Sequence, residues 1–213
     1  MLSSVLVSLL AFVVAAGVLT ITPGVDTAMV LRSAASGGTK SGSAAALGIC
    51  SGLFVWGIGA AFGLTALLAA SDLAFTVVKW LGAAYLVCLG VKLLVRPRTV
   101  FTHALADAGP RQGDVTNALQ RGFLTNILNP KVGVFYVTFL PQFMPPGVSV
   151  AAFSLVLASI HVLLTLGWFA LLIGLTVPLA RWLAKPRVGK ALDRLTGCVF
   201  LAFGARLAAS HAP

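Results

Sequence analysis

Long apolar blocks alternate with short polar connections along almost the whole chain. Most blocks reach or exceed the roughly 18 apolar residues that indicate a membrane-spanning helix. The six blocks run about from Val5 to Leu31, Ser43 to Ala69, Leu73 to Val95, Leu119 to Pro141, Val150 to Val177 and Ala191 to Ala209. The pattern predicts an all-α membrane protein with six transmembrane helices. The sixth block is the weakest, because Asp193, Arg194 and Arg206 shorten its apolar run.

Two of these blocks are interrupted by proline. Thr22-Pro23-Gly24 divides the first block, and Asn129-Pro130-Lys131 divides the fourth. Proline removes a backbone donor, and glycine frees the chain, so a regular helix is not expected to continue through the interruptions. The first and fourth helices are therefore predicted to be broken.

The chain is predicted to form a single transmembrane transporter domain over 1–213, built from two similar halves. A first repeat spans about 1–95, a hydrophilic cytoplasmic loop about 96–118, and a second repeat about 119–213. With three spans in each half, the second half crosses the membrane in the opposite direction. Broken helices at corresponding positions of two inverted repeats indicate the binding site of a secondary transporter.

Composition and charge agree with a membrane location. Hydrophobic residues make up 59% of the 213 residues and charged residues 9%, against roughly 25% charged in a soluble domain. The formal net charge is +10, which in a soluble protein would suggest a nucleic-acid partner. Here the basic residues lie between apolar blocks, so the expected partner is the lipid bilayer and not nucleic acid.

Basic residues gather at alternate connections. Eleven of the fifteen lie in or beside the connections between blocks one and two, three and four, or five and six. They are Arg32, Lys40, Arg96, Arg98, Arg111, Arg121, Arg181, Lys185, Arg187, Lys190 and Arg194. The connections near Ser71-Asp72 and Pro145-Pro146-Gly147 carry none. The positive-inside rule therefore predicts a multi-pass inner-membrane protein with both termini outside.

Asp26 lies inside the first apolar block, directly after the break. An acid at membrane depth is costly unless it faces a cavity or a partner. A half-helix that restarts at Asp26 would also direct its positive end at an anion. Two interpretations remain open: a helix cap near the cytoplasmic surface, since Arg32 follows six residues later, or a group that binds substrate or a proton.

The counterpart in the fourth block combines Asn126, Asn129, Pro130 and Lys131. Lys131 lies about ten residues from either end of its block, too deep to reach the surface easily, so it needs an acid, a carbonyl or water. We expect it to pair with Asp26 across the two halves. A purely structural polar bridge is the alternative.

His161 lies near the middle of the fifth block. A histidine at this depth either relays protons or donates one hydrogen bond to a neighbouring carbonyl. Both interpretations remain open.

Small residues at helical spacing mark the second block. The pairs are Gly48-x3-Gly52 and Gly59-x3-Gly63, and such pairs let helices approach closely. We expect them to serve packing within the bundle, and they also permit a homodimer.

Motifs of enzymes and cofactor sites are missing. The sequence contains no HExxH, GxSxG or P-loop, and its cysteines, Cys50, Cys88 and Cys198, stand singly. We therefore expect no enzyme activity, no cofactor and no metal site. Uphill transport would then depend on an ion gradient, for which Asp26 is a suitable proton carrier.

Four motifs in order resemble the LysE/RhtB family of bacterial amino-acid exporters, and its homoserine/threonine/leucine-type branch in particular. They are Thr22-Pro23-Gly24-Val25-Asp26, similar to the family's TPGPD signature; the glycine-rich run Gly37 to Gly52; Gly82-Ala83-Ala84-Tyr85-Leu86 with Gly90; and Gly122 to Lys131, continuing to Phe139-Leu140-Pro141-Gln142-Phe143. Val25 stands in place of the second proline of TPGPD. The resemblance implies six spans with inverted repeats, amino-acid efflux and exchange for protons.

The leading hypothesis is a secondary-active efflux permease for small or neutral amino acids or derivatives, working as a proton antiporter. Lys131 with nearby amides would bind the substrate carboxylate, and Asp26 would bind either the ammonium group or the proton. The predicted substrate- or proton-binding residues are Pro23, Gly24, Asp26, Asn126, Asn129, Pro130, Lys131 and His161.

Three other functions would require different features of the sequence. A transporter of metal or other inorganic ions should carry several deep acids or histidines. A membrane thiol–disulfide reductase needs paired cysteines. A non-transporting assembly subunit has no need for charged groups within the membrane.

Overall fold

The computed structural model describes residues 2–70, 72–95, 115–175 and 185–209. Within these ranges the chain is helical and contains no strand. The α-helices are α1 (Leu2–Ile21), α2 (Val25–Ala70), α3 (Asp72–Val95), α5 (Val115–Ile127), α6 (Pro130–Val134), α7 (Val150–Gly174) and α9 (Pro186–Ala209). Most of the predicted loop lies outside the described residues, as do Ser71, Arg96, Arg98, Arg111 and Arg181.

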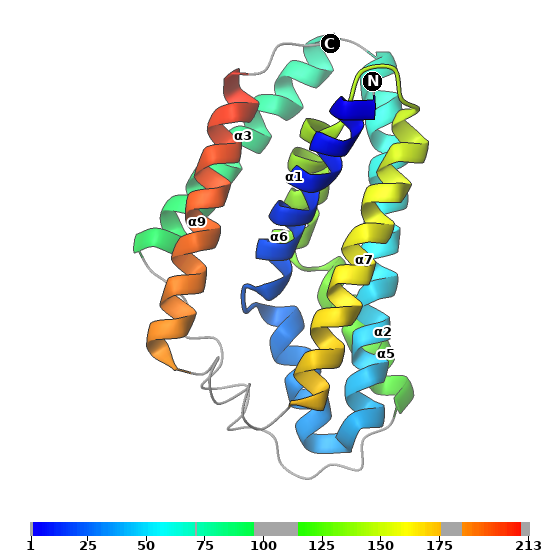
Figure 1. Ribbon diagram of the computed structural model, residues 1–213, viewed down its shortest axis with the longest axis vertical. Helices are drawn as coiled ribbons and strands as arrows, with labels where there is room; N and C mark the ends of the chain where they lie inside the picture. Colours follow the sequence, from blue (N-terminus) through cyan, green and yellow to red (C-terminus); the bar gives the residue numbers. More distant parts are fainter. Residues whose placement is uncertain (1, 71, 96–114, 176–184, 210–213) are drawn as a thin grey trace.

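Both predicted helix breaks are present. Helix α1 ends at Ile21, and α2 begins at Val25. Helix α5 ends at Ile127, and α6 begins with Pro130, whose missing N–H costs nothing at the first helical position. Figure 1 places both breaks near the middle of the molecule's length.

The fourth apolar block is less regular than a single helix. After α6, the chain forms a π-helical turn, η1 (Phe135–Phe139), and a 3-10 turn, η2 (Leu140–Phe143). Short π-helical turns within helices often accompany functional sites.

Helix α2 combines the end of the first apolar block with the second block. Its 46 residues include a kink at Gly38, where φ is 69° and ψ is −170°. Glycine adopts a positive φ without steric cost, and the chain reverses direction there (Figure 1). The returning part of the helix thus begins before Ser43, the predicted start of the second block.

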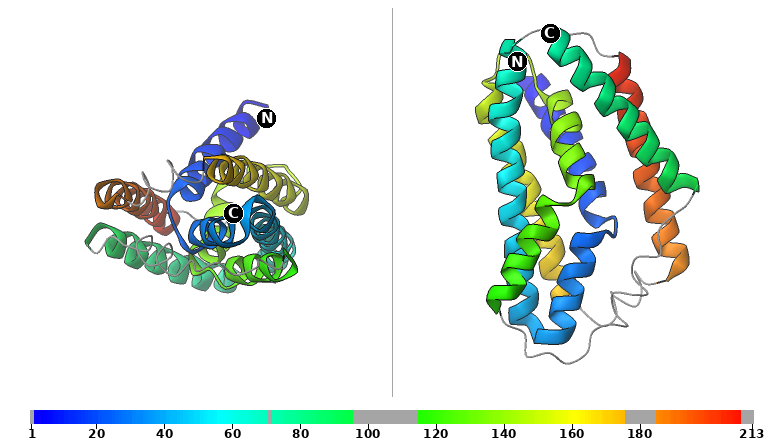
Figure 2. Two further views of the ribbon diagram at one scale, coloured as in Figure 1. Left: turned by 90° about the horizontal axis from the view of Figure 1, so that it is seen from below. Right: turned by 180° about the vertical axis from the view of Figure 1, so that it is seen from behind.

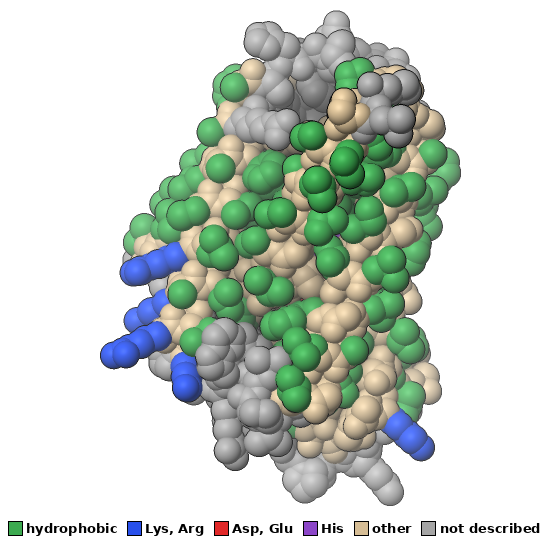
Figure 3. All heavy atoms as spheres, in the orientation of Figure 1, with side chains coloured by type: hydrophobic (Ala, Val, Ile, Leu, Met, Phe, Trp, Pro, Cys, Tyr) green, Lys and Arg blue, Asp and Glu red, His purple; other side chains and the backbone are tan. Residues whose placement is uncertain are grey.

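Length and composition qualify three described helical stretches as candidate membrane spans. They are Ser3–Ile21, Val25–Gly63 and Val150–Gly174. The middle stretch has 39 residues, more than the roughly 20 that one crossing requires, and the Gly38 reversal divides it. Exposed apolar side chains cover much of the visible surface, whereas the visible Lys and Arg side chains lie toward one end (Figure 3). The molecule therefore has the surface of a membrane protein.

Helix α9 begins earlier than the apolar pattern predicted. It starts at Pro186, and Arg187 and Lys190 in its first turns are exposed. The apolar pattern indicates only the part of a helix that can contact lipid. The first turns of α9 carry polar residues, so this pattern does not detect them. The predicted start at Ala191 was therefore too late.

Helices α2, α5 and α7 pack into the main bundle. A Cβ added to Gly48 would lie 2.0 Å from the carbonyl oxygen of Leu119, and one added to Gly52 would lie 2.6 Å from Asn126 Oδ1. This glycine pair therefore permits close packing, as predicted. At Gly59 and Gly63 an added Cβ would meet no described atom within 4 Å, so a packing role for this pair stays a prediction.

Helices α3 and α9 form a separate pair beside this bundle. Figure 1 and Figure 2 show them side by side, at the edge of the molecule. A hydrogen bond between the hydroxyl groups of Thr22, in the first break, and Thr196, in α9, connects this pair to the bundle. Aromatic contacts of Phe139 with Phe200 and Phe203, at centroid distances of 5.5 and 4.5 Å, add a second attachment.

Candidate functional site

Lys131 connects the two helix breaks. Its Nζ donates hydrogen bonds to the carbonyl oxygens of Leu19, at 2.9 Å, and Thr22, at 3.1 Å. These carbonyls belong to the end of α1 and the break that follows it. Carbonyls at a helix C-terminus lack intrahelical partners and carry partial negative charge. The ammonium group from the second break therefore caps the helix that ends at the first.

Asp26 lies in the first turn of α2, where the positive end of the helix favours a carboxylate. Its Oδ2 accepts a hydrogen bond of 2.9 Å from Nδ2 of the buried Asn126. Its Oδ1 is buried and has no hydrogen-bond partner among the described residues, and the same holds for Asn126 Oδ1. A buried acceptor is normally satisfied, so the free Oδ1 of Asp26 can receive a donor from a ligand.

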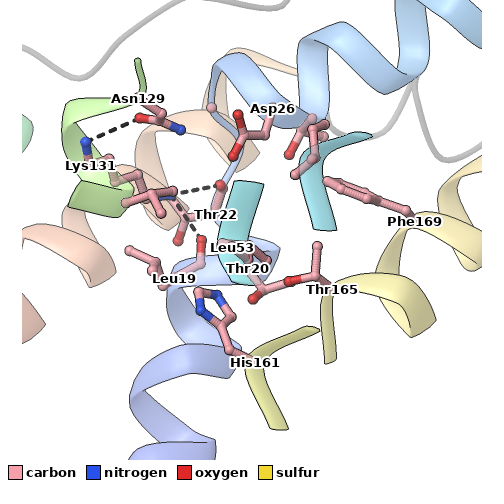
Figure 4. A pocket seen from close by; sticks show the side chains of 14 residues that line it. Leu19, Thr20, Thr22, Asp26, Leu53, Asn129, Lys131, His161, Thr165 and Phe169 are labelled. Atoms are coloured by element: carbon pink, nitrogen blue, oxygen red, sulfur yellow. Dashed lines mark hydrogen bonds between the residues drawn. The ribbon is translucent and has the colours of Figure 1, made fainter. Parts of the chain in front are cut away.

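Asn129 and Pro130 determine how α6 begins. The Asn129 side chain caps α6 by accepting a hydrogen bond of 3.1 Å from the backbone N–H of Lys131. Its carbonyl oxygen accepts from the N–H groups of Val132 and Gly133. The side chain of Lys131 thus leaves the helix at a fixed point of the first turn (Figure 4).

A small cavity lies between the charged groups and the main bundle. Its volume is about 40 Å³, enough for about three water molecules at roughly 10–15 Å³ each. Gly24, Asp26, Asn129, Lys131 and His161 are among the residues that line it (Figure 4). The two halves of the sequence therefore contribute opposite charges to one cavity.

The remaining lining divides into hydroxyl groups and an apolar wall. Thr20 and Thr165 provide hydroxyl groups, and Ile49, Leu53 and Phe169 provide apolar surface. None of these five residues was predicted from the sequence. Thr165 carried a usable signal, because it lies four residues after His161 in the same helix and so on the same helical face.

A second cavity, of about 20 Å³, lies toward the α3–α9 pair. Thr22, Pro23, Gly24, Asn129 and Lys131 form its side at the breaks. The opposite side comes from α3 and α9 and comprises Leu89, Leu93, Thr196 and Phe200. The two breaks therefore separate two small cavities.

His161 is buried and has a different partner from the predicted carbonyl. Its Nδ1 lies 3.2 Å from the hydroxyl oxygen of Tyr136, and the two rings stack at a centroid distance of 5.7 Å. Tyr136 belongs to the π-helical turn η1. The carbonyl interpretation is therefore wrong, whereas a role for His161 in moving protons stays a prediction.

The predicted site residues occupy three kinds of position. Gly24, Asp26, Asn129, Lys131 and His161 line the first cavity, and Pro23 lines only the second. Asn126 supports Asp26, and Pro130 is exposed at the start of α6. The direct pairing of Asp26 with Lys131 stays a prediction.

Comparison with known proteins identifies similar sequences over nearly the full length of the chain. Residues 17–211 match the family described as LysE type translocator. The chain is 33% identical over 208 residues to the uncharacterized membrane protein YrhP of Bacillus subtilis, covering 92% of this chain and 96% of that protein. It is 33% identical over 202 residues to the leucine efflux protein of Enterobacter sp., covering 94% of each.

A further relative is the homoserine/homoserine lactone efflux protein of Salmonella typhi. It is 29% identical over 201 residues, covering 94% of this chain and 96% of that protein. No solved structure matches the chain significantly.

Proposed function

The chain belongs to the LysE type translocator family, and on that premise we propose that it is a secondary-active exporter of small or neutral amino acids or their derivatives, coupled to protons. The observation that carries this proposal is the placement of Asp26 and Lys131 around one cavity. An amino acid carries an ammonium group and a carboxylate close together, and it needs groups of both charges at a similar separation.

Each charged side chain interacts with a helix end of opposite sign. Lys131 binds the negative end of α1, and Asp26 lies at the positive end of α2. Both groups can therefore stay charged away from water at reduced cost. The free Oδ1 of Asp26 would accept a hydrogen bond from the substrate ammonium group or bind the proton, and Lys131 would attract the substrate carboxylate.

The rest of the cavity supports an aliphatic or hydroxylated substrate. Ile49, Leu53 and Phe169 offer apolar contact, and Thr20 and Thr165 offer hydroxyl groups. Relatives named for leucine efflux and for homoserine efflux carry substrates of these two kinds. The substrate range proposed here is therefore small amino acids with apolar or hydroxyl side chains.

Six membrane crossings in two inverted repeats form part of the proposal. The two helix breaks, one in each half of the sequence and both near the middle of the molecule, support it.

The proposed orientation is that of a bacterial inner-membrane protein with both termini outside. The start of α1 and the end of α9 lie at one end of the molecule (Figure 1). The exposed basic residues Lys40, Arg121, Lys185 and Arg187 belong to the connections at the other end, which the positive-inside rule assigns to the cytoplasm.

Export can be tested in cells loaded with a panel of dipeptides. We expect cells that produce the protein to release one or a few amino acids faster than cells without it. Asp26→Asn, matched for membrane expression, should abolish the excess, because an amide cannot carry the charge or the proton. The amide can still accept the hydrogen bond from Asn126, so folding should be preserved. Unchanged release with Asp26→Asn would remove Asp26 from the site.

Proton coupling needs a separate measurement in inside-out vesicles. An acidic lumen should drive uptake of the exported amino acid, and a protonophore should remove the drive. Uptake that ignores the pH gradient would leave an exporter without proton coupling.

A further inference from the structure

A polar groove opens at the basic end of the molecule, apart from the cavities at the helix breaks. It has a volume of about 360 Å³ and lies between the first part of α2 and helix α5. Figure 2, seen from behind, shows these two segments at the same end of the molecule. Its lining residues are Met29, Arg32, Ser33, Ser36, Arg121, Leu124, Thr125 and Leu128.

Each wall of the groove changes from cationic to apolar along its length. On α5, Arg121 is followed by Leu124 and Leu128 at helical spacing, so the three side chains share a face. On α2, Arg32 follows Met29 by three residues. Because the two helical segments run in opposite directions, both arginines lie toward the end of the molecule and the apolar residues lie toward its middle.

The height of the groove in the membrane follows from helix geometry. Arg32 lies six residues beyond Asp26, which corresponds to roughly 9 Å along a helix. Half of the hydrocarbon core measures roughly 15 Å. Since the break lies near the middle of the molecule, the long side chain of Arg32 reaches the edge of the hydrocarbon core, where the lipid headgroups begin.

The charged groups of this groove are available for a ligand. Within the part of the chain that the structure describes, neither Arg32 nor Arg121 makes a side-chain hydrogen bond or ion pair. Both arginines are exposed. Leu124 is 54% exposed and Leu128 is 76% exposed. This exposed apolar surface beside the arginines favours a ligand with an acyl chain over a free amino acid.

We infer that this groove binds an anionic phospholipid, with the phosphate between Arg32 and Arg121 and an acyl chain along Leu124 and Leu128. Guanidinium groups bind phosphate by charge-assisted hydrogen bonds, and basic pockets between transmembrane helices on the cytoplasmic side are suited to anionic headgroups. The bound lipid would bridge the two helical segments that carry Asp26 and Asn126. The inference requires a membrane location but does not depend on the transported substrate.

The test is a titration of the full chain, purified in a neutral detergent, with phosphatidylglycerol. The rise in melting temperature gives an apparent dissociation constant. Phosphatidylcholine and soluble glycerol phosphate serve as parallel probes. We expect phosphatidylglycerol alone to stabilise the protein strongly. Arg32→Gln combined with Arg121→Gln should raise the apparent dissociation constant on the order of 30-fold.

A control variant separates a site from general charge. Lys40→Gln with Lys190→Gln removes two exposed basic residues of the connections assigned to the same side, outside the groove, and should keep the parent value. An equal loss in this control would overturn the proposal in favour of diffuse attraction. Equal stabilisation by glycerol phosphate would indicate a free-anion site, and equal stabilisation by phosphatidylcholine would exclude headgroup recognition.

The unsubstituted chain allows an independent measurement. Phosphatidylglycerol with a photoreactive acyl chain should label α5 at Leu124 or Leu128. Labelling confined to other helices would contradict the proposed site even if the arginine variant failed to fold.

Discussion

The two helix breaks both contain a proline but obtain their hydrogen bonds differently. The second break is capped within its own segment, because Asn129 caps α6 and Pro130 begins it. The first break depends on the second: Lys131 binds the carbonyls that end α1, and Asn126 binds Asp26. The two breaks therefore carry unequal structural roles.

This difference makes a directional prediction. A substitution that removes hydrogen bonds at the second break should destabilise both breaks. A substitution at the first break should destabilise only that break. Substitutions at Lys131, Asn129 and Thr22 should therefore rank in that order of severity.

Lys131→Met should have the largest effect. It leaves two carbonyls without their charged donor, and a buried acceptor that loses its partner costs about 1–3 kcal/mol. We expect a lower melting temperature in detergent and no amino-acid release in the dipeptide assay. The measurements are thermal unfolding of the purified protein and export at matched expression.

Lys92→Met is the matched control, because Lys92 is exposed on α3. It should melt and export like the parent protein. If Lys131→Met also exported at the parent rate, the dependence of the first break on the second would be refuted.

Asn129→Ala should have an intermediate effect. Loss of an N-cap typically costs about 0.5–2 kcal/mol, and a frayed α6 would misplace Lys131. Export should fall more than stability alone explains. Asn129→Asp restores a capping oxygen and should recover the melting temperature, so failure to recover it would show that the cap is not the relevant interaction.

Thr22→Val should have the smallest effect of the three. It removes hydroxyl contacts with Val18 and Thr196, and polar contacts in membrane bundles average about 0.6 kcal/mol. A double-mutant cycle with Thr196→Val should show less than additive loss, since both changes remove the same bond. Strictly additive losses would indicate that the two hydroxyl groups do not interact.

The sequence predicted what local chemistry determines. A proline in the interior of a helix interrupts it. Both breaks could therefore be predicted from Pro23 and Pro130. Asp26 and Lys131 could be identified because a charged side chain within an apolar block is costly and usually serves a function. These residues indicated the candidate site without any knowledge of the packing.

The contact partners of these residues could not be predicted, because they depend on how the helices pack. The sequence allowed Lys131 an acid, a carbonyl or water, and only the packed helices identify the carbonyls of Leu19 and Thr22. Gly52 and Gly59 look alike in sequence, yet only Gly52 meets a neighbouring helix among the described residues. Tyr136 was missed as the partner of His161 because a π-helical turn presents it.

The size of the cavity beside Asp26 has a consequence for the affinity of the exporter. At about 40 Å³, the cavity is much smaller than the roughly 150 Å³ of a cavity that holds benzene, so a leucine-sized substrate does not fit in this conformation. Binding therefore requires a wider conformation. The apparent dissociation constant then equals the intrinsic dissociation constant divided by the fraction of molecules in that wider state. A weak apparent affinity would thus report the rarity of the open state, and a substitution that only enlarges the cavity would strengthen binding without adding a contact.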